Sequence, residues 1–348
     1  MKIPKRLFSG YHGGCHCQGI AVDMKKGFIY YSFTTKLIKA DFKGNIIGTV
    51  ENLTGHLGCI DFHESDGRVY GSLEYKNDCI GKGIHSVLGV ERENEEGFYC
   101  AIFDVDRISR IGMDAEQDGI MKAVYLQDVV NDYLFPDHKY GCSGIDGTAW
   151  GPLCGDADQK EYLHIAYGIY GDVNRKDNDC QVILCYDAEN WWDTYARPLS
   201  QTAPHKNGPE KPLHKFFLHT GNTEWGIQNL EYDRCSGDYY AAVYKGKKPQ
   251  YKNYDLFVID GHFAPVSKTH PQSGERVEFL TLKKQKNGEN GLFFPYGSTG
   301  MFAVGDGRFL FSLPVRNKKH GHATKVRLYR RTEKEKRCFK KVYFNSYV

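Results

Sequence analysis

Short stretches of alternating polar and apolar residues recur along the chain, each followed by a glycine-containing turn and a second stretch rich in Tyr, Phe and Val. A pair of this kind predicts two antiparallel strands joined by a tight turn. Self-similarity at intervals along a chain indicates a repeat architecture. The pairs that align with one another are 16–23 with 27–31, 56–63 with 67–70, 144–151 with 162–167, 226–233 with 237–240, and 298–305 with 307–311.

A third strand is expected after each pair, at 36–41, 101–106, 182–187, 255–260 and 325–329, and a fourth is clearest at 45–50 and 122–126. Repeated four-stranded units predict an all-β fold, a single β-propeller of about five four-stranded blades. The expected blades span about 16–53, 56–130, 144–200, 216–284 and 293–348 of one domain covering 1–348, with 3–11 as an outer strand that closes the ring. A β-sandwich followed by a second β domain is the alternative.

Composition supports this interpretation and limits the cellular setting. The 348 residues include 24 Tyr, 20 Phe and 38 Gly, a bias that favours strands joined by tight turns. No apolar stretch approaches the roughly 20 residues of a membrane helix, and the basic N-terminal segment lacks the apolar region of a signal peptide. The 11 cysteines are odd in number and form no repeated CxxC pair, so we expect reduced thiols in a soluble, cytoplasmic protein.

Charge is concentrated near the C-terminus. The formal net charge is only +3, but residues 316–341 are strongly basic. Residues 325–329 alternate polar and apolar, as a half-exposed strand does, so the basic stretch indicates a solvated outer strand rather than a nucleic-acid surface. We therefore expect neither a nucleic-acid nor a membrane partner, and the sequence leaves the oligomeric state open.

The first repeat carries a family resemblance. The phrase Gln-Gly-Ile-Ala-Val-Asp at 18–23, followed by a turn and Gly-Phe-Ile-Tyr-Tyr-Ser at 27–32, resembles the repeat of NHL-type and streptogramin-lyase-like propellers. The likeness covers the first blade well and the other blades in outline. It implies a propeller fold and, taken alone, no activity, because one fold hosts many functions.

Polar and aromatic residues are expected to gather at one mouth of the propeller channel. The loops that precede the first strands and follow the second strands meet there, and loops on such a scaffold commonly carry function. Cations that converge on a cleft stabilise carboxylate or phosphate, and aromatic rings stack on sugar faces. The residues expected to bind substrate are Gln18, Glu74, Lys76, Asp146, Tyr167, Arg175, Trp225, Gln228, Lys245, Tyr296 and Arg316.

This combination favours a carbohydrate-active enzyme, either a polysaccharide lyase or a glycoside hydrolase, that cleaves a small, acidic, uronate-type oligosaccharide. In a β-elimination, Lys or Arg would neutralise the uronate carboxylate, and the expected catalytic residues His16, His56 and Tyr244 include the group that takes the proton.

Hydrolysis would instead require two carboxyls flanking the scissile bond, and the available acids are Asp146, Glu74 and Glu224. The first strands lack the Asp and Glu signatures of five-bladed furanosidase families, which weighs against membership of those families.

Two other functions are compatible with the same residues. A divalent metal on the channel axis would be held by His16, His56, Asp146 and either Gln228 or Glu231, and would suit a lactonase or phosphoesterase. Mixed nitrogen and oxygen ligands favour a transition metal, whereas an all-oxygen set favours calcium. The other possibility is a non-catalytic propeller that holds a glycan or a protein on the same face.

Overall fold

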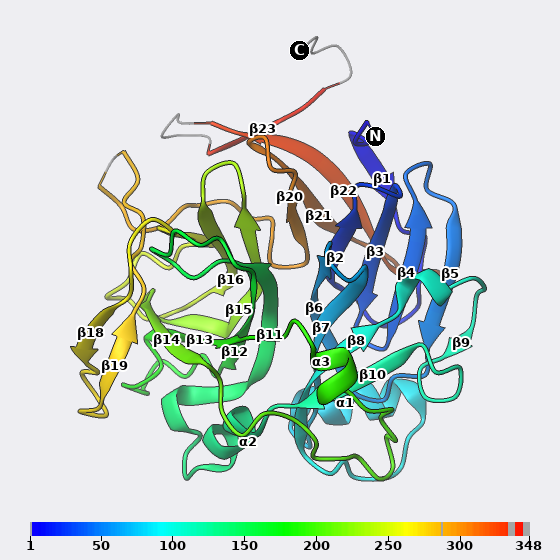
Figure 1. Ribbon diagram of the computed structural model, residues 1–348, viewed down its shortest axis with the longest axis horizontal. Helices are drawn as coiled ribbons and strands as arrows, with labels where there is room; N and C mark the ends of the chain where they lie inside the picture. The colour runs from blue at the N-terminus through cyan, green and yellow to red at the C-terminus, as the bar shows by residue number, and fades with distance from the viewer. Residues whose placement is uncertain (1, 287, 333–337, 344–348) are drawn as a thin grey trace.

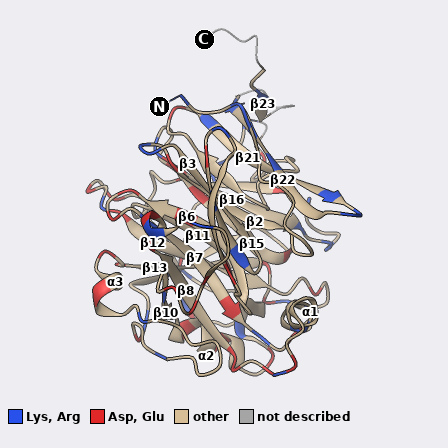
Figure 2. Ribbon diagram, turned by 90° about the vertical axis from the view of Figure 1, so that its right-hand side faces the viewer, with Lys and Arg blue, Asp and Glu red and all other residues tan. Residues whose placement is uncertain are grey.

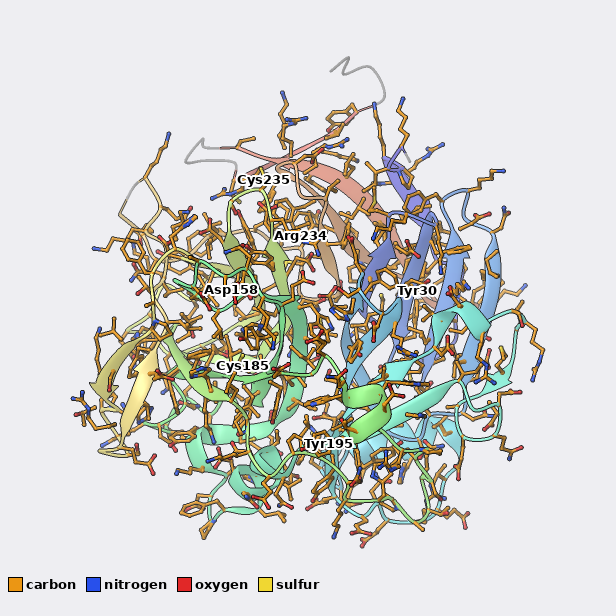
Figure 3. The ribbon with its side chains drawn as sticks, viewed as in Figure 1. Tyr30, Asp158, Cys185, Tyr195, Arg234 and Cys235 are labelled. Atoms are coloured by element: carbon orange, nitrogen blue, oxygen red, sulfur yellow. The ribbon has the colours of Figure 1, made fainter. Side chains whose placement is uncertain are left out.

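The chain folds as a five-bladed β-propeller in the computed structural model, which describes residues 2–286, 288–332 and 338–343. The innermost strands of the blades contact one another in a closed circuit, β2 with β6, β6 with β11, β11 with β15, β15 with β20, and β20 with β2. Figure 1 shows the blades arranged around this circuit, and side chains fill the space between them (Figure 3). The predicted fold class is confirmed, and the β-sandwich alternative is wrong.

The first two blades are regular. From the channel outward, the first comprises β2 (Cys17–Asp23), β3 (Phe28–Phe33), β4 (Lys36–Asp41) and β5 (Ile46–Glu51), with β9 (Met113–Asp114) parallel to β5. The second comprises β6 (His56–His63), β7 (Arg68–Tyr75), β8 (Gly97–Phe103) and β10 (Met121–Tyr125).

The third and fourth blades differ from the expected limits. The third comprises β11 (Cys142–Gly151), β12 (Tyr162–Ile169), β13 (Cys180–Tyr186) and β14 (His214–His219), extended by β19 (Arg276–Phe279) and β18 (Val266–Thr269). The fourth comprises β15 (Thr223–Asp233), β16 (Asp238–Lys245) and β17 (Leu256–Ile259), and Leu282 and Leu292 form isolated bridges to β17. Residues 216–219 and 266–279, expected in the fourth blade, thus pair in the third, across loops too long for local sequence to fix the partner.

The fifth blade joins the two ends of the chain. It comprises β20 (Met301–Ala303), β21 (Arg308–Asn317), β22 (Gly321–Arg331) and β1 (Arg6–Phe8), and β23 (Phe339–Lys341) also pairs with β22. Strand β1 lies antiparallel to β22, with Leu7 opposite Val326 (Figure 1). Residues 333–337 and 344–348 of the expected fifth blade lie outside the described residues.

The hairpins that repeat in the sequence share one turn geometry. The amide of Gly27 donates to the carbonyl of Asp23, and the amide of Gly237 donates in the same way to Asp233. Both glycines adopt positive φ, 75° and 72°, which glycine reaches without steric cost. The Asp23 carboxylate also accepts the amides of Lys25 and Lys26, so the recurring Asp and Gly are turn formers.

Helices occupy insertions between strands. They are α1 (Cys79–Leu88), α2 (Gln127–Leu134) and α3 (Trp191–Thr194), with the 3-10 helices η1 (Val105–Arg107) and η2 (Lys139–Gly141). No helix in the described part of the chain has the length and apolarity needed to cross a bilayer. All 11 cysteines are unpaired, as expected for a fold held by its core rather than by disulfides.

Candidate functional site

The upper ends of the inner strands, where β2, β6, β11 and β15 begin, are irregular. The pairing register shifts between Cys17 and Gly19, between Leu57 and Ile60, twice in β11 and twice in β15. A β-bulge bends the strand and re-aims its side chains, and bulges are frequent beside functional sites. The bulged ends turn polar side chains from several blades towards the channel.

These side chains line an inner hollow of about 140 Å³. It combines two imidazoles, two carboxyls, an ammonium group and a phenol with two amides and an indole. Its lining residues are His16, Gln18, His56, Glu74, Lys76, Ile80, Ser143, Ile145, Asp146, Gly168, Trp225, Gln228 and Tyr244.

A larger outer hollow of about 550 Å³ lies beside the inner one. His16 and Tyr244 line both hollows, so they stand at the junction. The rest of the outer lining is Val243, Lys245, Asp255, Phe294, Pro295, Tyr296, Ser298, Thr299, Pro314, Val315, Arg316 and His322.

A buried ion pair anchors the inner hollow. The ammonium of Lys76 lies 2.6 Å from Oε1 of Glu74 and donates to the carbonyl of Ser143 at 2.7 Å. Oε2 of Glu74 accepts the amide of Ile145 at 3.1 Å. Lys76 also lies 3.4 Å from Asp78, which caps α1 by accepting its first amides. Both oxygens of Glu74 are therefore engaged, and the pair ties β7 to β11 and to α1.

His56 lies against this pair. Its Nδ1 is 3.4 Å from Oε1 of Glu74 and makes no hydrogen bond among the described residues. Burial acts to lower the pKa of His56, but Glu74, with a contribution from Asp146, outweighs burial and raises the pKa above its ordinary value. The same contacts lower the pKa of Glu74 despite its burial, with Lys76 the strongest of them. Glu74 is thus held ionised and unavailable as a proton donor.

Asp146 is the carboxyl that remains available. Its Oδ1 accepts the amide of Cys59 from the neighbouring blade at 3.1 Å, and no hydrogen bond within the described residues reaches Oδ2. Burial raises the pKa of Asp146 to about 7, with a further contribution from Glu74, although His56 opposes the shift. Asp146 therefore keeps its proton through mildly acidic pH, as a general acid requires.

His16 is shifted in the opposite direction. Burial lowers its pKa to about 4, and the nearby His56 and His322 add to the effect. Its imidazole makes no hydrogen bond to another described residue. His16 is consequently neutral, and able to accept a proton, over the same pH range in which Asp146 holds one. Two groups in one site with pKa values pushed apart are the usual mark of an acid and base pair.

Trp225 shapes the wall of the inner hollow. It lies in a bulge of β15 with φ of 63°, a conformation that costs non-glycine residues about 1–3 kcal/mol and concentrates at functional sites. Its carbonyl accepts the side-chain amide of Gln228 at 2.9 Å. The side-chain amide of Gln18, on β2, donates to the hydroxyl of Thr34 at 3.0 Å. Both amide side chains are therefore fixed in direction and keep their carbonyl oxygens for a ligand.

The outer hollow is basic. Lys245 lies 3.4 Å from Asp255, whereas Arg316 has no ion pair among the described residues. His322 lies beside His16, with ring centroids 6.2 Å apart. Tyr296 contributes an aromatic face to the same wall. An anionic group that enters this hollow would meet an uncompensated guanidinium.

The structure brings together most of the expected residues but not all of them. Tyr167 is buried and donates to Asp132 at 3.0 Å in a cluster with α2, so it lines neither hollow. Arg175 pairs with Asp177 at 2.5 Å and also lies elsewhere. Glu224 pairs with Lys247 at 2.8 Å outside both hollows. Glu231 lies farther down β15, where it accepts the amide of Ala303 at 2.8 Å. Tyr167, Glu224 and Glu231 lie on strands β12 and β15 but line neither hollow, whereas Arg175 lies in the loop between β12 and β13.

Two titratable residues of the lining were not predicted from the sequence. His322 and Asp255 reach the outer hollow from the fifth and fourth blades. His322 belongs to the basic stretch 316–341, which we expected to form only a solvated outer strand. In the structure this stretch begins in the β21–β22 hairpin, and His322 of that hairpin lines the outer hollow.

The expected metal remains a prediction. Among the described residues, one group of three possible ligands brings its atoms within 4.8 Å of one another, Asp238, Asp260 and His262. Lys283 already lies 2.9 and 2.7 Å from the two oxygens of Asp238. His16, His56 and Asp146 do not form such a group.

Comparisons with known proteins give no family. No protein-family model and no curated protein matches the chain. Among solved structures, it is similar to the GH43 β-1,3-galactosidase BT3683, at 11% identity over 97% of this chain and 99% of that one, with a TM-score of 0.44. It is similar to the arabinanase Arb43A of Bacillus subtilis, at 9% identity over 92% and 97%, with a TM-score of 0.40. The Dos1 propeller gives 10% over 87% of this chain and 56% of that one, with 0.37. These similarities are too low to assign a family or an activity, so the NHL-type resemblance remains unconfirmed.

Proposed function

We propose that this propeller is a glycan-cleaving enzyme that breaks a uronate-containing oligosaccharide by β-elimination at the junction of the two hollows. The observation that carries the proposal is the position of His16 and Tyr244, which line both hollows. A uronate whose carboxylate lies near Arg316 would present the adjacent carbon to these two side chains.

The proton transfers can be assigned to groups in suitable states. The unpaired Arg316 neutralises the carboxylate and so acidifies the adjacent C5–H bond. Neutral His16 takes that proton, the C4–O bond breaks, and its electrons leave with the glycosidic oxygen while a C4=C5 double bond forms. Asp146 protonates the departing oxygen. The products are a new reducing end and a fragment with an unsaturated uronate, and solvent returns the proton from His16 to Asp146.

Elimination is favoured over hydrolysis by the state of Glu74. A glycoside hydrolase needs two carboxyls that can act on opposite sides of the bond. In the inner hollow the second carboxyl after Asp146 is Glu74, whose oxygens are already held by Lys76 and the amide of Ile145. Glu224 lies outside the hollow.

The test is incubation with uronate oligosaccharides of different ring stereochemistry, followed by absorbance of the conjugated product and by a reducing-end assay. Both signals should rise together, and His16→Ala should reduce both while the fold is retained, because the group that takes the proton is lost. New reducing ends without the conjugated product would indicate hydrolysis. Binding with neither signal would indicate a non-catalytic, glycan-holding propeller.

A further inference from the structure

One hairpin of the molecule concentrates positive charge. From Arg308 to Arg331 the chain contains no Asp or Glu. The free end of this segment, the β21–β22 hairpin from Pro314 to Ala323, projects from the fifth blade, and Figure 2 shows Lys and Arg at its tip. We call this end the basic arm. The cations of the whole segment are Arg308, Arg316, Lys318, Lys319, Lys325, Arg327, Arg330 and Arg331.

The cations of the basic arm are not used within the protein. Arg316, Lys318 and Lys319 are exposed and have no ion pair among the described residues. By contrast Arg308, at the base of the segment, pairs with Asp306. A surface that carries several uncompensated charges of one sign raises the local concentration of oppositely charged ligands.

The arm is held in a fixed position. The N-terminal segment runs along its β22 side, where the amide of His12 donates to the carbonyl of His322 and the amide of His322 donates to Gly13, both at 2.8 Å. The amide of Thr324 donates to the hydroxyl of Ser9 at 2.9 Å. A charged element that is already ordered loses little conformational entropy when it binds a ligand.

The other side of the arm faces the outer hollow. Pro314 and Arg316 of β21, and His322 opposite Arg316 on β22, line that hollow. Lys318 and Lys319 follow in the turn at the tip, within about 10 Å of Arg316 at the usual rise of an extended strand. The positive charge of the hollow therefore continues without a break onto the arm.

We infer that the basic arm binds a polyuronate chain that extends out of the channel mouth, so that the natural ligand is a polymer rather than a short oligosaccharide. The inference rests on the proposed function for the site at its inner end. Regularly spaced carboxylates along a polyuronate match cations in a row, and the arm supplies such a row from Arg316 to Lys319. A neutral polysaccharide would gain nothing from it.

The experiment compares Lys318→Glu/Lys319→Glu with a control of equal charge change, Lys43→Glu/Lys268→Glu. Lys43 lies in the exposed β4–β5 turn and Lys268 on the exposed strand β18, away from the hollows. Binding of polygalacturonate, polymannuronate and hyaluronan is measured by titration at several salt concentrations, with dextran as the neutral polymer and a DNA duplex as a different polyanion. Circular dichroism establishes that each variant is folded.

We expect the arm variant to lose about tenfold or more in affinity for at least one polyuronate at low salt, with a flatter salt dependence. The control should keep the wild-type affinity, and cleavage of a matching trisaccharide should be the same in all three proteins. Equal losses in both variants, or DNA bound as tightly as every polyuronate, would overturn the inference. Arm-dependent polymer binding without any cleavage would leave this inference standing and remove the proposed function instead.

Discussion

The two ends of the channel, the upper one where the inner strands begin and the lower one where they end, each carry an aspartate on an inner strand. Asp146 at the upper end is buried and Asp61 at the lower end is half-buried, and the two carboxyls are held differently. At the lower end Asp61 of β6 accepts backbone amides on both oxygens, from Phe62 and Trp150, each at 2.7 Å. At the upper end Asp146 of β11 accepts one amide through Oδ1 and leaves Oδ2 without a hydrogen bond in the described residues. Asp61 therefore joins two blades with both of its oxygens, whereas Asp146 joins two blades with one oxygen and also lines the inner hollow.

The hollows at the two ends differ in the same way. The lower one is larger, about 710 Å³, and contains both charge signs. Its cations are already paired, Arg234 with Glu64 and Glu161, and Lys160 with Asp187 (Arg234 is labelled in Figure 3). Cavity size alone would favour the lower hollow. The groups without partners lie at the upper end, and for that reason we place the proposed site there.

The largest difference between the two ends is expected when each aspartate is replaced by asparagine. Asp146→Asn should lower the rate of glycan cleavage by about 10²–10⁴-fold, because the general acid is lost, while substrate affinity is kept. Asp61→Asn should leave the rate near the wild-type value and act on stability. Initial rates and equilibrium binding are measured for both variants. Equal losses of rate would contradict the assignment of Asp146 as the general acid.

Breaking one ion pair at each end gives the next largest effect. Lys76→Met leaves the ionised Glu74 buried without its partner and should reduce the free energy of unfolding by about 3–5 kcal/mol. Arg234→Met removes an ion pair whose arginine side chain is 54% exposed, and should cost about 0–1 kcal/mol. Urea denaturation measures both. A larger loss for Arg234→Met would mean that the lower end is the more tightly coupled one.

The raised pKa of Asp146 should make the free energy of unfolding depend on pH. The folded protein keeps a proton on this residue up to about pH 7, whereas an unfolded aspartate loses it near 3.8. The folded state therefore binds more protons between these values, and this contribution to stability declines as pH rises through them, by at most about 1.4 kcal/mol per pH unit. The stability difference between wild type and Asp146→Asn should follow that decline, and a constant difference from pH 4 to 7 would be inconsistent with it.

Activity should depend on pH in two steps. The rate should rise above about pH 4, where His16 becomes neutral, and fall above about pH 7, where Asp146 loses its proton. Asp146→Asn should remove the upper step from whatever activity remains.

The smallest expected effect concerns single exposed cations. Arg316→Ala should reduce kcat/KM for a uronate substrate by about tenfold, and less at high salt, because a charge-assisted contact at the solvent boundary is lost. Lys160→Ala at the lower end should leave kcat/KM unchanged. The measurement is steady-state kinetics of both variants at two ionic strengths. Equal changes in kcat/KM would show that an unpaired cation at the upper end matters no more than a paired one at the lower end.

Sequence patterns predicted the parts of this molecule that are set locally. The Asp23 and Gly27 turn positions and the aligned first strands led to the propeller, and the same alignment placed His56 and Asp146 in one hollow. Tyr167 was misplaced because alternation along β12 turns it into a cluster with Asp132, a contact that depends on where α2 packs. The engagement of Glu74 depends on an amide from another blade and has no local signal.

The pairing of β14, β18 and β19 with the third blade could not be predicted from the local sequence either. These strands join the edge of the third blade across long insertions, and the partner is decided by which edge remains open after the blades assemble. The bulge at Trp225 likewise has no local sequence signature, apart from the glycine that follows it.

The bond between Ser9 and Thr324 joins positions 315 residues apart, and it closes the same blade that supplies Arg316 to the mouth. During synthesis the first four blades can form in succession, but His16 and Arg316 cannot face each other until the last strand hairpin has been made. Contacts of such long range form slowly in folding. A chain released before that hairpin would hold most of the strands but would lack Arg316 and His322, and with them one wall of the outer hollow.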